Sequence, residues 1–409
     1  MRKRMIISAI FLAAATSLMA GGYQVSLHGQ KQIGMGLIGT SLSLDASSAF
    51  YNPGGLAMMS DRLSLMAGGS AIFANTAFRM EQPSLYHAST DNPMGTPFYV
   101  YAGYMVTDRL AAGLAVNTPY GNSLAWEDGW AGRFLIQEIS LRAITIQPTI
   151  AYQINDFLSV GAGFVYALGS VDLTRALPVQ GPEGEGSVNI SGNTGNFGFN
   201  AGVLYAGPTG LNIGVSYRSK IEMELDDADA SFTVPSSLSH LFPAENRVAV
   251  MLPLPANLDF GLSYQVTRDL MVGMALNYVF WDAYKELNFN FETNTPSLPD
   301  SSNPREYSNT LIFRLGGQYR ASETLYLRAG GYYDPSPVNE RFFSPETPSL
   351  DNLAFTGGLS FVPNKMISID ASLLYIIGLE NDVTYEPENF GGTYTSRVII
   401  PGIGITVSL

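Results

Sequence analysis

The amino-acid sequence predicts an all-β fold, a transmembrane antiparallel β-barrel of about fourteen strands. Three observations predict it: a secretory leader with no later run suited to a spanning helix, sustained two-residue alternation of apolar side chains, and connections that are short at one end of each hairpin and long at the other. Together they favour strands that cross a membrane over a soluble, secreted domain.

The first twenty residues have the parts of a secretory signal peptide. Residues 2–4 are basic, residues 5–15 are apolar, and residues 16–20 provide a small-residue exit, so cleavage is predicted after Ala20. The apolar run is shorter than the roughly 20 residues that a helix needs to cross a bilayer. We therefore expect a mature chain that starts at Gly21, and the sequence shows no later helical span.

Composition narrows the class of protein further. The 409 residues would suit two or three soluble domains, but they include 42 Gly, 22 Tyr and 22 Phe. Only 14% are charged, against roughly 25% in soluble domains. The absence of Cys excludes disulfides and thiolate metal sites. Loss of the three basic residues of the leader takes the net charge from −13 to −16, which argues against a nucleic-acid partner.

Alternation with a period of two is the strongest signal in the chain. Along 270–280 the even positions are large and apolar, while the odd positions include Gly273 and Asn277. The segments 311–319 and 367–377 alternate in the same way. Each such strand has one apolar face and one mixed face, as expected when one side meets lipid and the other a lumen.

The connections distinguish a membrane barrel from a soluble sandwich. Short polar turns are predicted near 107–109, 155–156, 208–209, 267–269, 321–323 and 363–364. Long connections rich in Pro, Gly, Asn and Asp are predicted at 81–96, 176–194, 226–252 and 294–307. Short periplasmic turns and long extracellular loops are typical of outer-membrane barrels.

On this basis the strands are predicted at 61–80, 97–107, 109–118, 139–154, 157–175, 195–206, 210–225, 253–266, 269–292, 308–320, 323–334, 351–363, 366–379 and 393–409. Tyrosine and phenylalanine crowd the strand ends, which fits aromatic girdles at the two membrane surfaces.

Residues 21–60 show no sustained alternation. They are expected to form either a periplasmic extension or a plug folded into the barrel, whose lumen is too wide for wall side chains alone to fill. The predicted division is a signal peptide at 1–20, an N-terminal hatch or plug at 21–60 and a transmembrane barrel at 61–409.

A motif in this segment resembles a known family. Gly34, Gly36 and Gly39 precede the run Asp45-Ala46-Ser47-Ser48-Ala49-Phe50-Tyr51-Asn52-Pro53-Gly54-Gly55-Leu56-Ala57. The run is similar to the N-terminal hatch of the FadL family of outer-membrane transporters for hydrophobic compounds. The family typically has Ala where this chain has Gly54, and we expect Gly54 to loosen the segment. The resemblance assigns hatch or gating roles to Phe50, Asn52, Pro53 and Gly54.

Further matches follow in order along essentially the whole mature chain. They are Pro119-Tyr120-Gly121, Trp130 with Gly132-Arg133, Pro148 with Ala151-Tyr152, Tyr217-Arg218-Ser219, Phe280-Trp281-Asp282, Leu327-Arg328-Ala329-Gly330 and Asp334-Pro335-Ser336-Pro337. The resemblance implies a monomeric barrel closed by the hatch, a ligand groove between outer loops and a pocket above the hatch. It also implies a hatch shift and a strand kink that open a lateral route into the bilayer, which spares an apolar tail from contact with water.

Four arginines on candidate strands or their ends are candidate contacts for a fatty-acid carboxylate: Arg175, Arg218, Arg314 and Arg328. By strand parity the last three point into the lumen, and a guanidinium binds a carboxylate through two hydrogen bonds. The alternative is that they pair with luminal carboxylates and brace the plug, the candidates being Asp259, Asp334 and Asp370.

No metal or other cofactor is expected. The three histidines, His28, His87 and His240, are scattered and have no metal-ligand spacing. An acidic cluster at Asp226, Asp227 and Asp229 is interpreted as part of a solvated loop rather than a calcium site.

The sequence therefore predicts a non-enzymatic, passive channel of the bacterial outer membrane, in contact with membrane lipid and lipopolysaccharide. Long-chain fatty acids are the leading substrates, with the apolar loop segments 241–243 and 248–254 as a capture surface. Monoaromatic hydrocarbons are the rival within the family. A general porin for polar solutes, a lipase or protease barrel and an adhesin barrel are the alternatives from other classes.

Overall fold

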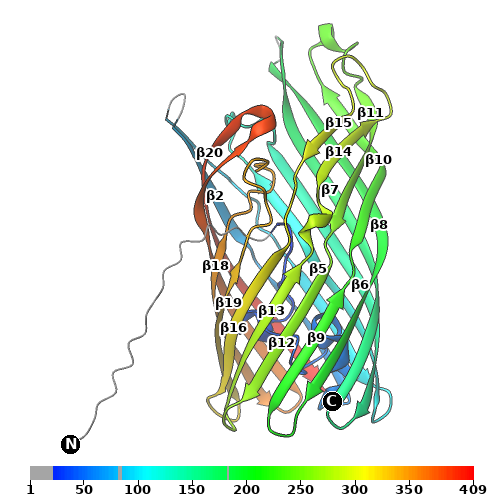
Figure 1. The fold of residues 1–409 in the computed structure, drawn as a ribbon, viewed down its shortest axis with the longest axis vertical. Helices are drawn as coiled ribbons and strands as arrows, with labels where there is room; N and C mark the ends of the chain where they lie inside the picture. Colours follow the sequence, from blue (N-terminus) through cyan, green and yellow to red (C-terminus); the bar gives the residue numbers. More distant parts are fainter. Residues whose placement is uncertain (1–21, 82–84, 182–183) are drawn as a thin grey trace, which may run out of the picture.

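The computed structural model describes residues 22–81, 85–181 and 184–409 and shows a closed, tilted β-barrel (Figure 1). The predicted signal peptide lies outside the described residues. The wall is a ring of fourteen antiparallel strands, which confirms the predicted all-β barrel of about fourteen strands. In order around the ring they are β1 (Leu63–Ser70), β4 (Phe98–Met105), β5 (Leu110–Ala125), β6 (Glu138–Asn155), β7 (Leu158–Gly181), β8 (Gly184–Ala206), β9 (Leu211–Arg218), β12 (Asn257–Gln265), β13 (Leu270–Val279), β16 (Thr310–Arg320), β17 (Leu325–Asp334), β18 (Asn352–Asn364), β19 (Ile367–Tyr385) and β20 (Phe390–Ser408).

The barrel closes where the last strand meets the first. β20 pairs with β1 in a register that runs from Ser64 opposite Ser408 to Ser70 opposite Gly402. Main-chain pairing along the whole ring leaves no open sheet edge, and the bilayer requires this because its interior offers no water to satisfy free backbone groups.

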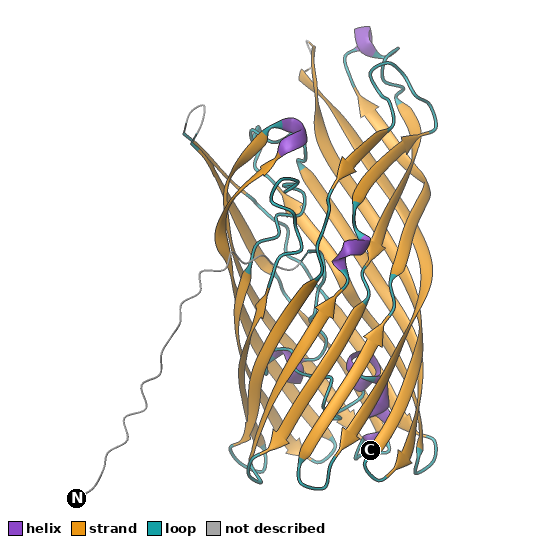
Figure 2. Ribbon diagram, in the orientation of Figure 1, coloured by secondary structure: helices purple, strands orange, loops and turns teal. Residues whose placement is uncertain are grey.

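Shorter strands extend the wall at the end of the barrel opposite the short turns, which we call the outer end (Figure 2). They are β2 (Phe73–Met80), β3 (Tyr86–Ser89), β10 (Ile221–Thr233), β11 (Glu245–Leu254), β14 (Glu286–Phe291) and β15 (Ser301–Pro304). Three 3₁₀ turns interrupt the outer connections: η2 (Ser236–Leu238), η3 (Trp281–Ala283) and η4 (Glu386–Glu388).

Two predicted long loops are in fact largely strands. β7 and β8 remain paired as far as Gly181 opposite Gly184, within the predicted connection 176–194, and β10 and β11 occupy much of 226–252. The acidic cluster at 226–229 therefore lies in β10 rather than in a loop. These outer strands are stable because inward residues from several of them form one apolar cluster, which includes Leu177, Val188, Ile190, Phe232, Phe242 and Val248.

The predicted parity of the strands is confirmed. In β16 the odd positions are exposed, with Leu311 at 48% and Leu315 at 56%, whereas Arg314 between them is 5% exposed. In β19, Ser368, Asp370 and Ser372 are buried. Apolar side chains thus cover the outside of the barrel, and polar side chains point inward.

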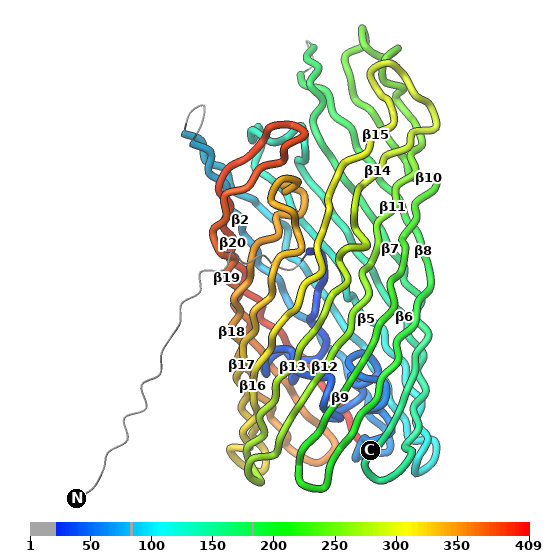
Figure 3. Tube along the Cα trace, viewed as in Figure 1, coloured from blue at the N-terminus to red at the C-terminus, as the bar shows by residue number. Residues whose placement is uncertain are grey.

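The N-terminal segment, residues 22–60, runs down inside the ring of strands (Figure 3). It contains α1 (Gln30–Ile33), α2 (Ser48–Tyr51) and the 3₁₀ helix η1 (Pro53–Met58). α1 contacts β18, β19 and β20, while η1 contacts the next part of the ring, from β4 to β8. In the described part of the chain, no helix is long and apolar enough to cross a membrane.

Candidate functional site

An apolar groove lies among the outer strands and loops. It has a volume of about 580 Å³. Its apolar lining includes Phe134, Leu135, Leu177, Phe232, Leu241, Phe242, Phe289 and Phe390. Leu241 and Phe242 belong to the apolar loop segment 241–243, a predicted capture surface. Four charged side chains also line the groove: Arg175, Arg305, Glu346 and Glu388.

A buried ion pair occupies the inner end of this groove. A guanidinium nitrogen of Arg305 donates to Glu346, and the two residues are only 3% and 8% exposed. Ser344 donates to the other carboxylate oxygen of Glu346 at 2.7 Å. Burial works against the charge of Arg305, but the Glu346 carboxylate outweighs it and raises the pKa of Arg305. Both residues lie in connections, where no periodicity marks an inward position, so the pair could not be predicted from the sequence.

A narrower apolar pocket follows toward the membrane. Its volume is about 80 Å³, and it shares Leu173, Ile190, Leu287, Phe289 and Glu346 with the groove. Val250, Leu252 and Leu254, from the second predicted capture segment, line this pocket rather than the outer surface.

Tyr23 and Tyr120 line the pocket where it meets the N-terminal segment. Tyr23 donates to the carbonyl of Pro253 and packs edge-on against Trp281 with ring centroids 5.0 Å apart. Tyr120 donates to the carbonyl of Pro255 at 3.0 Å. These side chains separate the apolar pocket from a polar chamber that Tyr120 also lines.

The polar chamber lies between the N-terminal segment and the wall. It has a volume of about 30 Å³, and Arg218, Arg314 and Asp259 are among its lining residues. Arg218 donates to Gln147 at 3.0 Å and to the carbonyl of Phe50 at 3.0 Å, and its guanidinium stacks 4.2 Å from the Phe50 ring centre. Within the described residues, Arg218 forms no ion pair within 4.0 Å.

Arg314 is held by weaker contacts, at 3.4 Å to the carbonyl of Leu37 and 3.3 Å to Asn277. Its Nε is buried and has no hydrogen-bond partner among the described residues. His28 stands nearby with its ring centre 3.8 Å from that of Phe50. Burial chiefly, and then Arg218, lower the pKa of His28 to about 3, so this histidine is neutral.

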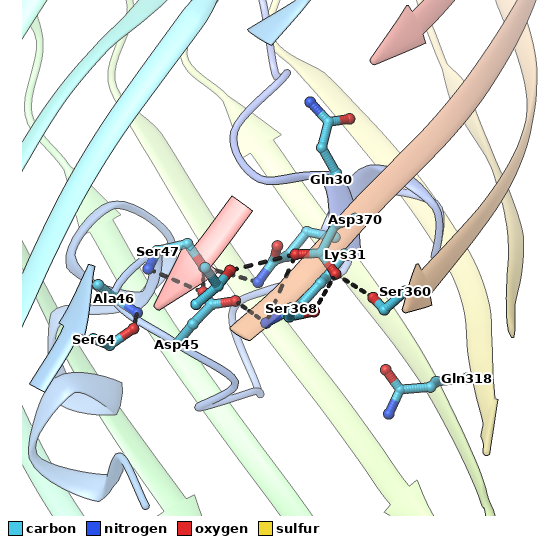
Figure 4. A network of polar contacts seen from close by, with 12 residues as sticks. Gln30, Lys31, Asp45, Ala46, Ser47, Ser64, Gln318, Ser360, Ser368 and Asp370 are labelled. Carbon is cyan, nitrogen blue, oxygen red and sulfur yellow. Dashed lines mark hydrogen bonds and ion pairs between the residues drawn. The ribbon is translucent and has the colours of Figure 1, made fainter. Parts of the chain in front are cut away.

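Arg328 lies in a different place from the other two inward arginines. It donates to Gln318 at 2.8 Å and to Ser360 at 2.5 Å, beside a separate cavity of about 240 Å³ that Lys31 also lines. Figure 4 shows the adjoining polar network around Lys31 and Asp370, in which Ser360 and Ser368 donate to Asp370. The structure thus brings Arg218 and Arg314 together, and it places Arg175 in the outer groove and Arg328 in the cavity beside Lys31.

Ion pairs and hydrogen bonds fix the N-terminal segment to itself and to the wall. Lys31 lies 3.0 Å from Asp45 and 4.0 Å from Asp370 of β19. Burial would raise the pKa of Asp45, but Lys31 and the Ser47 hydrogen bonds outweigh it and hold the pKa below its ordinary value.

The segment around Gly54 is packed closely, contrary to the expectation that a glycine there would loosen it. The Gly54 carbonyl accepts from Ser159 of β7 at 2.7 Å, and its amide donates to Asn52 at 3.1 Å. A Cβ added at Gly54 would lie 3.1 Å from backbone atoms of β7 and β8. The glycine therefore permits a close approach to the wall, and this approach outweighs its conformational freedom.

The wall is irregular where the N-terminal segment crosses β5. The pairing of β5 with β6 shifts between Asn117 and Tyr120. At this point the main chain of β5 forms hydrogen bonds with the N-terminal segment. The Val25 amide donates to the Pro119 carbonyl at 2.8 Å, and the Gly121 amide donates to the Tyr23 carbonyl at 3.0 Å.

The acidic cluster in β10 is partly neutralised by a neighbouring strand. Arg247 of β11 lies 2.6 Å from Asp229 and 3.6 Å from Asp227. In the described ranges, no group of three or more histidine, aspartate or glutamate side chains is arranged to hold a metal ion.

Comparison with known proteins is consistent with this geometry. The long-chain fatty acid transport protein of Salmonella typhi is 23% identical over 414 residues, covering 94% of each chain. The crystal structure of a Pseudomonas aeruginosa FadL homologue covers 95% of this chain and all of its own, with a TM-score of 0.80 and 19% identity. That of the Ralstonia pickettii toluene transporter TbuX covers 93% of this chain and 98% of its own, with a TM-score of 0.72 and 19% identity.

The model of one protein family, described as outer membrane protein transport protein (OMPP1/FadL/TodX), matches residues 11–408. The match spans nearly the whole chain, including every strand of the barrel, and the fold agrees with it. This protein belongs to the OMPP1/FadL/TodX family of outer-membrane transport proteins.

Proposed function

We propose that this outer-membrane protein is a passive, non-enzymatic channel for the uptake of hydrophobic small molecules, with long-chain fatty acids as its main substrates. The observation that carries the proposal is the order in which differently lined spaces follow one another along the lumen. An apolar groove shares its inner residues with an apolar pocket, and Tyr120 stands between that pocket and a chamber lined by Arg218 and Arg314. Apolar walls suit an acyl chain, and the two guanidinium groups suit its carboxylate.

We propose that the N-terminal segment acts as a hatch, with 21–60 as the hatch and 61–409 as the barrel. Asn52, Pro53, Gly54 and Phe50 support this role through their contacts. Asn52 bonds the wall, Pro53 begins η1, and Phe50 is stacked under Arg218. A ligand that draws Arg218 toward its carboxylate removes the hydrogen bond that this arginine makes to the Phe50 carbonyl.

The lateral route is proposed to open at the irregular part of β5. The backbone there pairs with residues 23–25 instead of continuing in regular register with β6. Movement of the N-terminal residues removes these contacts and frees a gap through which an apolar chain enters the bilayer without crossing water. The protein is proposed to work as a monomer in contact with lipopolysaccharide.

Monoaromatic hydrocarbons are the second candidate substrates. The observation that favours them is the size of the inner pocket, which at about 80 Å³ suits a small ring and is lined mostly by apolar side chains. A related fold, TbuX of Ralstonia pickettii, is described as a toluene transporter.

Mass spectrometry of small molecules extracted from the purified protein, with competition binding of oleate and toluene, tests the proposal. Binding of oleate in preference to toluene supports fatty-acid uptake. Preference for toluene would identify monoaromatic hydrocarbons, rather than fatty acids, as the substrates of the channel. Binding of neither, together with steady ion conductance in planar bilayers, contradicts both and leaves a general porin.

A further inference from the structure

Part of the outer connection between β17 and β18 folds back into the barrel. This inner loop segment, residues 344–350, is held by hydrogen bonds that its atoms make with the wall and the N-terminal segment. The Trp126 indole donates to Pro345 at 3.1 Å, and the Asn122 amide donates to the carbonyl of Glu346 at 2.7 Å. The amide of Gly22 donates to Ser349 at 2.9 Å. The inner loop segment therefore joins the outer groove to the start of the N-terminal segment.

One ion pair fixes the charged side chain of this segment. Glu346 lines both the groove and the apolar pocket, and Arg305, its partner, lines the groove. The pair thus stands where a ligand passes from one space to the other. A buried pair of this kind resists separation, because removal of one partner leaves an uncompensated buried charge.

Arg305 has unused capacity to bind a carboxylate. One Nη donates to Glu346 and the other to the carbonyl of Pro304 at 3.1 Å. Its Nε is buried and has no partner among the described residues. A guanidinium binds a carboxylate best through two parallel hydrogen bonds, and Glu346 fills only one of the available positions.

A second guanidinium lines the same groove. Arg175 forms no hydrogen bond through its side chain and no ion pair in the described part of the chain. The carboxylates of the groove are the buried Glu346 and the exposed Glu388. Two arginines thus line a groove that contains a single buried carboxylate, and only one of them, Arg305, is paired with it.

Replacement of the Glu346 carboxylate by a ligand carboxylate costs less free energy than separation of Arg305 from Glu346, because Arg305 then keeps a negatively charged partner. An anionic ligand would keep Arg305 paired if Glu346 turned toward the open groove, where water would solvate it. A neutral ligand would provide no such replacement and would leave the ion pair closed. Only the anionic ligand would therefore remove the ion pair that holds the inner loop segment.

We propose that the carboxylate of an anionic amphiphile replaces Glu346 at Arg305, with Arg175 as the second guanidinium, and so releases the inner loop segment. Arg305 and Glu346 are then specificity-determining residues that admit acids in preference to neutral hydrocarbons. The inference rests on the proposed function, since it concerns the same uptake path.

The test measures binding of oleate and of oleyl alcohol, which share an alkenyl chain but differ in charge, to the purified full chain at pH 8. Glu346→Gln removes the competing carboxylate, and oleate affinity is expected to rise about tenfold while oleyl alcohol affinity stays unchanged. Arg305→Gln removes the preference for oleate. Arg305→Lys keeps the charge and the fold but not the planar fork, and recovers only part of that preference.

The matched control is Glu386→Gln. Glu386 pairs with Arg341 at 2.8 Å, but that pair is exposed to solvent, with side chains 45% and 67% exposed. The control should change neither affinity. Hydrogen exchange of residues 344–350 should increase on addition of oleate and not of oleyl alcohol.

Three results would contradict the proposed exchange of carboxylates at Arg305. A fall in oleate affinity in Glu346→Gln shows that Glu346 assists the ligand rather than competing with it. Equal binding of oleate and oleyl alcohol by the wild type and by all three variants of the Arg305–Glu346 pair rejects the exchange but leaves uptake of hydrophobic molecules intact. Binding of neither probe by any form rejects the proposed function, and the exchange falls with it.

Discussion

The side-chain amide of Asn52 donates to the main-chain carbonyl of Val203 in β8 at 2.9 Å, and so ties the N-terminal segment directly to the barrel wall. The same amide donates to Thr40 at 2.7 Å, and its oxygen accepts from the amide of Gly54 at 3.1 Å. Asn52 is fully buried. One side chain thus satisfies three backbone groups that are shut off from water.

Asn52→Ala should loosen the N-terminal segment. Each buried group left without a partner costs about 1–3 kcal/mol. The expected result is a lower apparent melting temperature and more frequent ion-conducting events in planar bilayers. The control is Asn193→Ala, at an exposed position of β8. Equal conductance in the two variants would show that Asn52 does not hold the segment against the wall.

Gly214→Ala should displace the segment at another point. A Cβ on Gly214 of β9 would lie 1.9 Å from the carbonyl oxygen of Thr40, a contact that only backbone movement can relieve. Such overpacking typically costs about 1–3 kcal/mol. Hydrogen exchange of residues 38–42 should become faster. Gly357→Ala is the matched control, because a Cβ there meets no atom within 4 Å, and the prediction fails if both variants exchange alike.

The ion pair of Lys31 with Asp45 should make the stability of the segment depend on pH. Because the folded structure lowers the pKa of Asp45, the stabilisation is complete above its unfolded pKa of about 4 and is lost as the pH falls through the lower, folded value. Asp45→Asn should therefore destabilise the protein at pH 7, by about 3–5 kcal/mol for a buried pair.

Thermal unfolding of Asp45→Asn and the wild type at a series of pH values checks this prediction. The difference between them should shrink in acid, where the wild-type carboxyl is also neutral. Glu222→Gln breaks the exposed pair of Lys220 and Glu222 and serves as the control. A difference that stays constant down to the lowest pH would rule out the charge of Asp45 as its cause.

Arg218→Met should slow oleate uptake by about tenfold or more and leave toluene uptake unchanged, because a hydrogen bond to a charged group contributes about 1.5–3 kcal/mol. Arg328→Met should change oleate uptake little, since Arg328 lies outside the polar chamber and is engaged by Gln318 and Ser360. Uptake of both labelled compounds into cells measures the effect. Equal loss for oleate and toluene would assign Arg218 a purely structural role.

Several features of this protein could be predicted from its sequence because they depend on local order. Successive side chains of a strand point to opposite faces, so a two-residue pattern marks each strand and the face of each side chain. The inward position of Arg314 follows from this parity, and it lies between the exposed Leu311 and Leu315 as expected. The tight turns and the number of strands in the ring follow from the same pattern.

The tertiary structure decided what depends on contacts between distant residues. Arg305 and Glu346 are 41 residues apart in irregular connections, and no pattern in either connection indicates that they meet. The outer parts of β7, β8, β10 and β11 are strands because they pack and pair with one another, although their turn-forming residues predicted loops. The close contact of Gly54 with the wall likewise depends on strands more than a hundred residues away. Local periodicity determines how each strand faces, whereas the positions of the charged groups along the lumen depend on how the whole chain closes on itself.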